Sequence, residues 1–508
     1  MLVLEKLREH GEKGRIALVN REKQLTYQEL DMRSDAFAAW LLATLGEDRT
    51  PVVLYGEKEM DFLCCLLGTL KSGRAYVPID RAVPRERATR ILEEVHPKVI
   101  VDFGGLSPQT EAQVLDPSKV AELLTRPLEV PVPRERWVHG EDVVYILFTS
   151  GSTGTPKGVP ITVSNLENFY WGLLPWYPKE EGGVILHQIS YSFDVSGCAV
   201  YVGLARGMTL FTVDKEMTRE YEELFAQLGR SGLTLWASTP SFAELCIQSG
   251  LFQEALLPNL RQFLFCGEVL THTLCDALAH RFPRAQVINT YGPTEATVLV
   301  TAVEVTDRMR EDDSRSIPIG RAIPGVQLRL EDKDGTLIPG DGREGQLVIL
   351  GPSVGPGYFG RPDLTEKSFF QDLVTGLRGY RTGDLCYRAG ELYYYCGRAD
   401  NQLKLNGFRV EVEDVEQNLQ KLPNVSRVAV VPVREGEKVQ YLAAFLLLQV
   451  PDGLTPLKRS IQLKRQASAL LPDYMIPRKF FAVDAFPLNV NGKVDKKELA
   501  RRLQEGEV

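Results

Sequence analysis

Short apolar runs alternate with helical patterns along most of this chain, and that alternation limits the folds that it can adopt. Runs such as VVLY, VVYILF and QLVIL recur between helical patterns such as YEELFAQLGR. They predict an α/β fold. Around GRADNQLKLNGF the sequence becomes polar and turn-rich, and a shorter βα pattern follows. We expect a large N-terminal body of several subdomains, with helix-covered sheets, over residues 1–399, and a small α+β C-terminal domain over residues 400–508.

Composition and charge argue against several classes of function. The formal net charge of -8 gives no general attraction to phosphate backbones, so no nucleic-acid partner is expected. The first residues lack the continuous apolar stretch of a signal peptide. The longest apolar run, LAAFLLL at residues 442–448, is far shorter than the roughly 20 residues that cross a bilayer. We therefore expect a cytoplasmic protein without stable membrane insertion, in which residues 442–448 form a buried strand.

The thiol and imidazole side chains show no metal-binding pattern. The eight cysteines lack CxxC spacing, and the six histidines lack the spacing of metal ligands. We expect reduced thiols and no zinc site built by the protein alone.

A loop rich in glycine and hydroxyl groups follows the apolar run at residues 143–148. It reads TSGSTGTPKG at residues 149–158 and carries one cation, Lys157. Glycines let main-chain N–H groups approach phosphate oxygens closely, while hydroxyls and a lysine add hydrogen bonds and charge. It is not a Walker loop, because Pro156 precedes the lysine and Gly158 follows it. The loop predicts a polyphosphate site, although many Gly/Ser-rich segments are only flexible surface turns.

This loop resembles the signature phosphate loop of the adenylate-forming superfamily, which includes peptide-synthetase adenylation domains, acyl-CoA synthetases and luciferases. Six further segments resemble the family's motifs, in the family's order. They are LKSGRAYVPID (70–80), NTYGPTEAT (289–297), EGQLVILGPSVGPGY (344–358), YRTGD (380–384), GRADNQLKLNGFRVE (397–411) and PLNVNGKVD (487–495). The resemblance covers nearly the whole chain and implies an ATP-consuming, AMP-forming ligase. In that reaction a carboxylate attacks the α-phosphorus of ATP and expels pyrophosphate, and a thiol then attacks the mixed anhydride.

The resemblance also assigns roles to particular residues. Lys493 follows the turn signal Asn491-Gly492 and is implied to be the catalytic lysine, which contacts the substrate carboxylate and a phosphate. Asp384 is implied to accept hydrogen bonds from the ribose hydroxyls, assisted by Arg398. The residues implied to bind ATP are Thr149, Ser150, Gly151, Ser152, Thr153, Gly154, Lys157, Asn289, Thr290, Tyr291, Gly292, Pro293, Thr294, Asp384, Tyr395, Arg398 and Lys493.

Two further implied roles concern a metal ion and a domain movement. Glu295 is implied to help hold Mg²⁺, which offsets the triphosphate charge and keeps several waters. Asp400 matches the family's hinge, where one residue absorbs the rotation of the C-terminal domain. Taken alone, either carboxylate could be an ordinary turn residue.

Asp194 and Cys266 bear on the identity of the acid. Asp194, in ISYSFDVSG, matches the aspartate that amino-acid-activating members place against the substrate ammonium, although it could instead cap a helix beginning at Val195. Cys266 stands where typical members have Gly or Ala. Its side chain would fill space beside the substrate α-carbon and disfavour one enantiomer, although it could also be a small core hydrophobe.

Three further segments narrow the resemblance. WASTPSFAEL, FLFCGEVL and the run TYGPTEATV that ends at Val298 are similar to those of the superfamily's D-alanine:D-alanyl carrier protein ligases. The implied substrate is D-alanine. The substrate-binding residues that the resemblance implies are Asp194, Cys266, Val298 and Lys493.

The acceptor thiol is expected on a separate protein, because the chain ends at Val508 soon after the lysine motif. The resemblance implies a phosphopantetheinylated D-alanyl carrier protein that serves lipoteichoic acid D-alanylation, and an enzyme that acts as a monomer. Carrier proteins are usually acidic, so basic residues near the C-terminus are predicted to attract this partner. They are Lys493, Lys496, Lys497, Arg501 and Arg502.

Three alternatives remain open. An acyl-CoA synthetase with free CoA as the thiol would share most motifs, as would a stand-alone adenylation enzyme for glycine or an L-amino acid. From a different class, a nucleotide-binding sensor or scaffold would have kept the loop and lost the chemistry. Asp194 and Cys266 argue against the first, and the presence of Lys493, Asp384 and Glu295 argues against the last.

Overall fold

The structure is a computed structural model that describes residues 1–150, 156–399, 402–405, 407–436, 438–450, 453–487 and 494–506. The chain forms two compact units. Unit 1 comprises Met1–Arg81, Val95–Leu147 and Gly158–Gly397, and unit 2 comprises Ala82–Glu94, Phe148–Lys157 and Arg398–Val508. Unit 2 therefore contains the expected C-terminal region together with two earlier segments, one of which holds the predicted phosphate loop.

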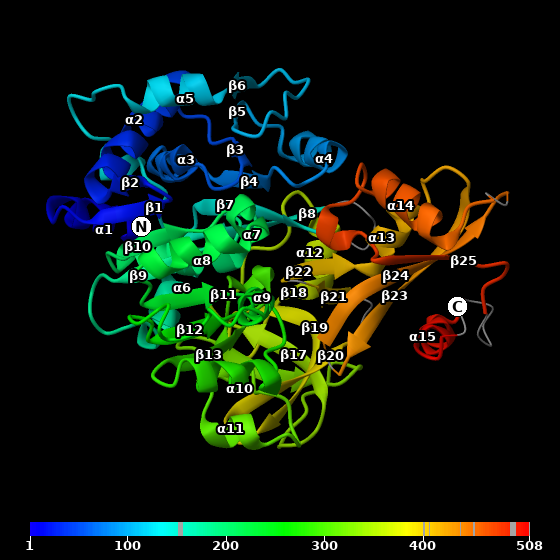
Figure 1. Cartoon of the computed structure of the whole chain (residues 1–508). Helices are drawn as coiled ribbons and strands as arrows, with labels where there is room; N and C mark the ends of the chain where they lie inside the picture. The colour runs from blue at the N-terminus through cyan, green and yellow to red at the C-terminus, as the bar shows by residue number, and fades with distance from the viewer. Residues whose placement is uncertain are drawn as a thin grey trace. The chain divides into compact units, whose positions relative to one another are not determined.

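The first sheet of unit 1 has the strand order β6-β5-β3-β4-β7-β8 (Figure 1). Strands β6, β5, β3, β4 and β7 are parallel neighbours. Helix α3 is buried on every side from Phe62 to Lys71, as expected of a helix with apolar residues all round that packs between a sheet and other helices. The elements are β3 (Val52–Gly56), β4 (Tyr76–Asp80), β5 (Val99–Asp102), β6 (Gln113–Leu115), β7 (Val143–Thr149), β8 (Lys157–Thr162), α1 (Leu2–Glu12), α2 (Tyr27–Leu45), α3 (Met60–Lys71) and α5 (Pro117–Leu124).

The second sheet has the order β15-β14-β13-β12-β11-β9-β10-β1-β2 and is buried on both faces. Leu235 and Leu264 pack into one core and their neighbours Trp236 and Phe263 into another, because successive side chains of a strand point to opposite faces. The strands are β1 (Ile16–Asn20), β2 (Lys23–Thr26), β9 (Val184–His187), β10 (Thr209–Thr212), β11 (Leu235–Ser238), β12 (Gln262–Phe265), β13 (Gln286–Tyr291), β14 (Thr301–Glu304) and β15 (Arg321–Ala322). Its helices are α6 (Val163–Leu173), α7 (Lys215–Arg219), α8 (Tyr221–Arg230), α9 (Pro240–Ile247), α10 (His272–Arg281) and α11 (Asp307–Glu311).

The third sheet of unit 1 is antiparallel, with the order β16-β17-β19-β18 and β20 paired to β19. Its elements are β16 (Gln327–Glu331), β17 (Gly345–Leu350), β18 (Phe369–Gln371), β19 (Arg378–Ala389), β20 (Leu392–Arg398) and α12 (Pro362–Ser368). The predicted α/β body with helix-covered sheets is confirmed, and the antiparallel sheet adds a layer that the sequence pattern did not distinguish.

Unit 2 combines a two-stranded ladder, β21-β22, with the three-stranded sheet β23-β24-β25. The predicted buried strand at residues 442–448 is confirmed as the end of β24. Within this unit Arg87 of α4 forms a buried ion pair with Asp414 of α13 at 2.9 Å. The elements are α4 (Arg85–Val95), β21 (Gln402–Leu405), β22 (Phe408–Glu411), α13 (Val412–Leu419), β23 (Val425–Glu435), β24 (Lys438–Leu448), α14 (Pro456–Ala467), β25 (Lys479–Ala482) and α15 (Lys496–Gln504).

Two further findings concern the whole described chain. All eight cysteines are free thiols. In the part of the chain that the structure describes, no helix combines the length and the apolar character needed to cross a bilayer.

Candidate active site

Asp384 lies on a bulge of β19 and faces the end of β13. Val348 of β17 pairs with Arg381 and Gln346 pairs with Leu385, so three residues, 382–384, stand opposite Leu347. Gly383 adopts a φ of 75°, which other residues reach only with strain. The bulge directs Asp384 inward, where its carboxylate is 1% exposed and accepts a hydrogen bond from the hydroxyl of Tyr291.

Tyr291 belongs to the NTYGPTE segment, whose polar side chains hold its backbone in place. The Asn289 amide donates to the carbonyl of Pro318 at 2.8 Å, and the Thr290 hydroxyl donates to the carbonyl of Phe265 at 2.7 Å. A Cβ added to Gly292 would stand 2.6 Å from the Val298 carbonyl oxygen, so the turn has no space for a side chain there. The chain thus ends β13 with a fixed, bare backbone beside Tyr291 and Asp384.

Glu295 lies in a 3-10 turn over Thr294–Ala296 and is fully buried. Its Oε1 accepts a hydrogen bond from the Tyr358 hydroxyl at 2.8 Å. Among the described residues there is no group of three or more His, Cys, Asp or Glu side chains that could hold a metal ion. A cation at Glu295 would therefore take most of its ligands from phosphate oxygens and water, which is the coordination that Mg²⁺ prefers.

Cys266 follows β12 and Val298 precedes β14, and the two residues meet in the core. Cys266 directly follows β12, is 1% exposed, and lies with its Sγ 3.7 Å from the Val298 carbonyl oxygen. Thr297 and Val298 adopt left-handed φ angles of 61° and 68°. This conformation is costly for β-branched residues, and such strain concentrates at functional sites. The Thr297 hydroxyl helps to hold it by donating to the Ser353 carbonyl at 2.7 Å.

Asp194 opens the 3-10 turn Asp194–Ser196 in the connection after β9. Phe193 occupies the N-cap position, so Asp194 is not the cap of a helix beginning at Val195. Burial, followed by the neighbouring charge of Asp194, raises the pKa of Tyr145 well above its ordinary value. The Tyr145 hydroxyl is buried without a hydrogen-bond partner among the described residues. The carboxylate of Asp194, in the connection after β9, and the unsatisfied hydroxyl of Tyr145, inside β7, thus stand near each other.

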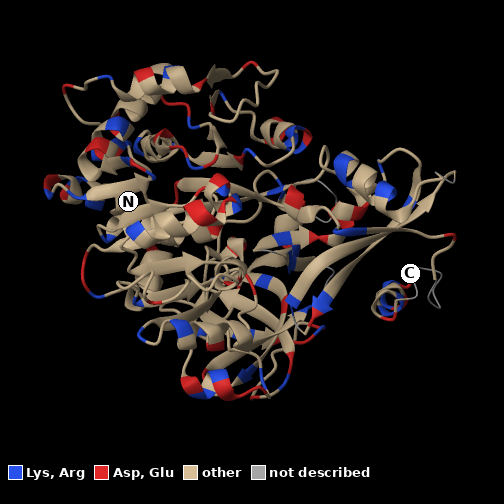
Figure 2. Cartoon of the chain, in the orientation of Figure 1, with Lys and Arg blue, Asp and Glu red and all other residues tan. Residues whose placement is uncertain are grey.

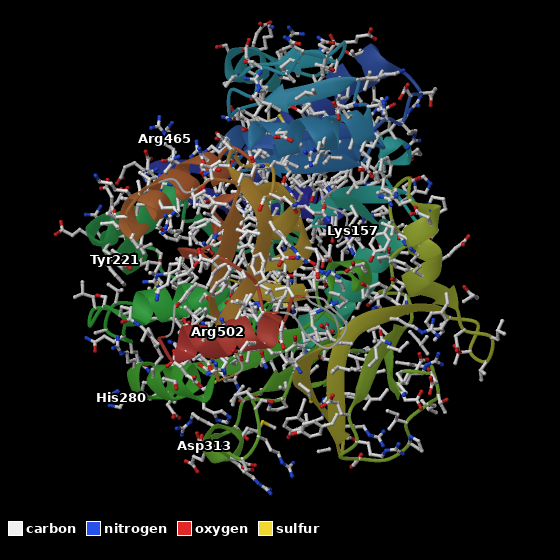
Figure 3. The ribbon with its side chains drawn as sticks, turned by 90° about the vertical axis from the view of Figure 1, so that its right-hand side faces the viewer. Lys157, Tyr221, His280, Asp313, Arg465 and Arg502 are labelled. Atoms are coloured by element: carbon white, nitrogen blue, oxygen red, sulfur yellow. The ribbon has the colours of Figure 1, made fainter. Side chains whose placement is uncertain are left out.

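The remaining predicted residues fall elsewhere. In unit 2 the Ser150 hydroxyl donates to the Arg409 carbonyl at 2.8 Å, and the Thr149 hydroxyl is buried without a hydrogen-bond partner among the described residues. Lys157 begins β8 and is half-buried (Figure 3). Tyr395 and Arg398 lie on β20. The predictions for Gly151, Ser152, Thr153, Gly154, Asp400 and Lys493 lie outside the described residues.

Two residues of the site were not predicted from the sequence. Tyr358 ends a segment that was recognised as a family motif, but its bond to Glu295 depends on a contact across 63 residues. Tyr145 sits inside an apolar run that indicates only a buried strand. For Tyr358 the motif was a usable signal, whereas Tyr145 gave none.

This arrangement is typical of a nucleotide-binding site: a buried carboxylate, an aromatic ring and a bare turn meet at the carboxyl end of β13, which pairs in parallel with β12. Residues 6–359 match the family described as AMP-binding enzyme, and residues 414–493 match the AMP-binding enzyme C-terminal domain. The chain belongs to the AMP-binding enzyme family.

Named relatives lie within this family. The chain is 39% identical over 484 residues to a D-alanine--D-alanyl carrier protein ligase of Bacillus anthracis, covering 95% of each chain. It is equally similar over 485 residues to the protein of the same name from Bacillus thuringiensis, again covering 95% of each.

Solved structures show the same fold. An artificially fused adenylation-PCP di-domain from Klebsiella oxytoca superimposes with a TM-score of 0.82 at 21% identity, covering 94% of this chain and 93% of that one. A Vibrio cholerae adenylation domain in complex with glycyl-adenosine-5'-phosphate gives 0.80 at 23% identity, covering 99% and 98%. An NRPS protein containing adenylation and PCP domains, bound to a vinylsulfonamide inhibitor, gives 0.81 at 26% identity, covering 98% and 84%.

Proposed function

We propose that this protein activates D-alanine with ATP as D-alanyl-AMP and transfers the D-alanyl group to the phosphopantetheine thiol of a D-alanyl carrier protein. The similarity to named ligases over 95% of both chains supports the proposal. The structural observation that carries it is the meeting of Tyr291 and Asp384 beside the bare turn at Gly292. This pair can accept a ribose and flank an adenine without moving the backbone.

Within unit 1, the described residues offer one binding place for the nucleotide and another for the amino acid. Asp384 would accept hydrogen bonds from ribose hydroxyls, for which an ionised carboxylate is suited, and Tyr291 would lie against the base. Asp194, which is half-buried, would face the ammonium of the amino acid, because a carboxylate that is partly removed from water favours a cation as its partner. Bringing the carboxylate of the amino acid to the α-phosphate is then chiefly a matter of positioning, which can supply much of the rate enhancement.

Two groups would complete the chemistry. We propose Mg²⁺ at Glu295, where it would offset phosphate charge. We also propose Lys493 as the catalytic cation, delivered by a C-terminal domain of residues 400–508 that turns about Asp400. A mobile lysine that bridges two anions would act on charge that develops in the transition state.

The acceptor, the compartment and the assembly state belong to the same proposal. The carrier would act in trans on a monomeric cytoplasmic enzyme and serve lipoteichoic acid D-alanylation. The names of similar ligases and the carrier-bearing structural neighbours support a carrier-protein acceptor.

An amino-acid panel in pyrophosphate exchange tests the proposal directly. D-alanine should support ATP–pyrophosphate exchange best, with D-serine, glycine and L-alanine weaker. Exchange that requires a long-chain or aryl acid, or that prefers L-alanine, would replace the proposed substrate. Absence of exchange with every acid, in the presence of ATP and Mg²⁺, would remove the adenylating activity itself.

A further inference from the structure

Lys58 is a buried lysine whose ammonium bonds to neutral groups. It follows β3, is 4% exposed, and reaches the end of β9 in the other large sheet of unit 1. Its Nζ lies 2.8 Å from His187 Nε2 and donates to the Ile189 carbonyl at 2.6 Å. It also stands 4.4 Å from the ring centre of Tyr191. No described carboxylate bonds to this ammonium. A buried ammonium without such a partner is costly, so its presence calls for a purpose other than stability.

His187 provides an acceptor for this ammonium. The imidazole is 1% exposed, and its Nδ1 lies 3.3 Å from the Thr212 hydroxyl oxygen. Burial, and then the charge of Lys58, lower the pKa of His187 well below its ordinary value. A neutral ring with its proton on Nδ1 leaves Nε2 free to accept from Lys58.

Two of the three partners of Lys58, Ile189 and Tyr191, belong to one segment, residues 188–193, which joins β9 to Asp194. Other contacts hold the same segment to β4 and α3. The Ser190 hydroxyl donates to Asp80 at 2.6 Å, and the Ser192 hydroxyl donates to the Pro78 carbonyl at 3.1 Å. The ring of Tyr191 stacks on Phe62 with centres 4.7 Å apart. Lys58 adds contacts to both Ile189 and Tyr191, from the connection that follows β3.

We propose that Lys58 is a positioning residue for Asp194: by holding residues 188–193 it sets where that carboxylate meets the ammonium of the amino acid. The inference rests on the proposed function for its substrate, but the anchoring itself does not. In this role Lys58 acts through the segment and not on the reacting atoms. Loss of Lys58 should therefore raise the KM for the amino acid and leave the KM for ATP unchanged.

The charges around Lys58 link this role to pH. Burial lowers the pKa of Lys58 to about 7, against the raising effects of Glu57, Asp80 and Glu59 and with a lowering effect of Lys215. Glu57 and Glu59 share its connection, Asp80 ends β4, Lys215 lies on α7, and His187 faces it from β9. Above neutral pH the ammonium loses its proton, so its bonds to Ile189 and its attraction to the Tyr191 ring weaken. Lys58 should therefore hold residues 188–193 most firmly at slightly acid pH.

Lys58→Met tests the proposal, because methionine keeps the length of the chain without the ammonium. We expect its KM for D-alanine to rise about tenfold, the loss typical of a charge-assisted hydrogen bond, with the KM for ATP unchanged. Hydrogen exchange of the free protein should show faster exchange in residues 188–193. Lys71→Met is the matched control, because Lys71 is equally buried but bonds to Asp31 and Asp35. It should leave both readouts unchanged.

The wild-type protein offers a test that needs no variant. Its KM for D-alanine should rise between pH 6 and pH 8.5, about threefold, while the KM for ATP stays level. A flat profile, or equal effects of Lys58→Met and Lys71→Met, would overturn the proposal. If the wild type fails to activate D-alanine, the proposed function fails instead. Exchange in residues 188–193 would then still decide whether Lys58 holds the segment.

Discussion

Cys266 is the residue whose environment bears most directly on enantiomer choice. It is enclosed between the end of β12 and the strained backbone at Val298, so its side chain has little freedom to move aside. A filled volume at a fixed position can reject a methyl group that points toward it. Alternatively, Cys266 is only a small hydrophobic residue of the core. That role explains its burial equally well but predicts that its removal leaves the choice of enantiomer unchanged.

Cys266→Gly should distinguish a role in enantiomer selection from a role in packing alone. Removing the side chain opens space, and discrimination between D-alanine and L-alanine should fall by about ten- to a hundredfold in kcat/KM, the range expected for one small group in a pocket. Pyrophosphate exchange with each enantiomer measures the ratio. Cys275→Ala, at another buried cysteine, serves as the control. An unchanged ratio would leave Cys266 as a packing residue.

His272 carries a hydrogen-bond pattern that only its cation satisfies. Its Nδ1 lies 2.9 Å from the Arg310 carbonyl oxygen and its Nε2 lies 2.8 Å from that of Arg315. A neutral imidazole has one N–H and cannot donate to both. Burial opposes the charge, but the two carbonyls and the nearby Asp313 and Asp276 raise the pKa of His272 above its ordinary value.

Stability should therefore depend on the protonation of His272. Because the folded pKa lies above the unfolded one, the stabilisation is complete below about pH 6.5 and is lost as pH rises through the folded value. His272→Ala should lower the free energy of unfolding by about 1 kcal/mol more at pH 6 than at pH 8.5. Denaturant melts at both pH values measure it. The exposed His280 on the same helix gives the control variant (Figure 3). A pH-independent difference would contradict the assignment.

At the scale of elements, the bulge in β19 decides the position of Asp384. A regular antiparallel strand would alternate residues 382–384 between its two faces. The bulge instead leaves Leu347 opposite all three residues, and its geometry is held by the Thr382 hydroxyl, which donates to the Leu347 carbonyl at 2.8 Å. The TGD motif thus forms a β-bulge, and this bulge brings the carboxylate of Asp384 to the end of β13 in another sheet.

Basic residues occur on two helices of unit 2, α14 and α15. In α15, Lys496 pairs with Glu416 at 2.8 Å, and Arg502 pairs with Glu498 at 2.8 Å. Helix α14 has four basic and no acidic residues (Figure 2). It also exposes Leu457 and Ile461, beside a hollow of about 670 Å³ lined by Lys458, Ile461, Gln462, Arg465 and Gln466.

Charge reversal tests which of the two helices, α14 or α15, attracts an acidic carrier protein. Lys458→Glu with Arg465→Glu should lower kcat/KM for the carrier about tenfold at low ionic strength, because steering by exposed charge speeds association. Pyrophosphate exchange should stay unchanged. Arg501→Glu with Arg502→Glu, in the paired helix α15, should have a smaller effect on transfer. The reverse order would return the docking site to α15, where the sequence placed it.

For the whole molecule, the residues of the candidate site are divided between the two units. Unit 1 holds Asp384, Tyr291, Glu295 and Asp194 on its own strands and turns, while unit 2 takes in Ser150 and the start of the phosphate loop. In the proposed function the catalytic Lys493 comes from the sequence of unit 2. Loss of that lysine should therefore leave substrate binding to unit 1 intact.

Lys493→Ala should lower adenylate formation by at least about a hundredfold, the usual cost of removing one group that stabilises transition-state charge. ATP binding by calorimetry should persist. Transfer from synthetic D-alanyl-AMP to the carrier should also persist, because thiol attack does not use this lysine in the proposed mechanism. Near-normal exchange in this variant would refute the role of Lys493.

The sequence was sufficient for the α/β class, the family and the residues of each motif, because all of these depend on local order: the apolar runs, the TGD and NTYGPTE segments and the glycines where a side chain would clash. Tertiary structure decided which distant residues meet. Tyr358 bonds to Glu295, Lys58 anchors the segment before Asp194, and Glu416 neutralises Lys496, because folding brings together side chains that lie tens to more than a hundred residues apart. No local pattern records such contacts, since each depends on the packing of separate strands and helices.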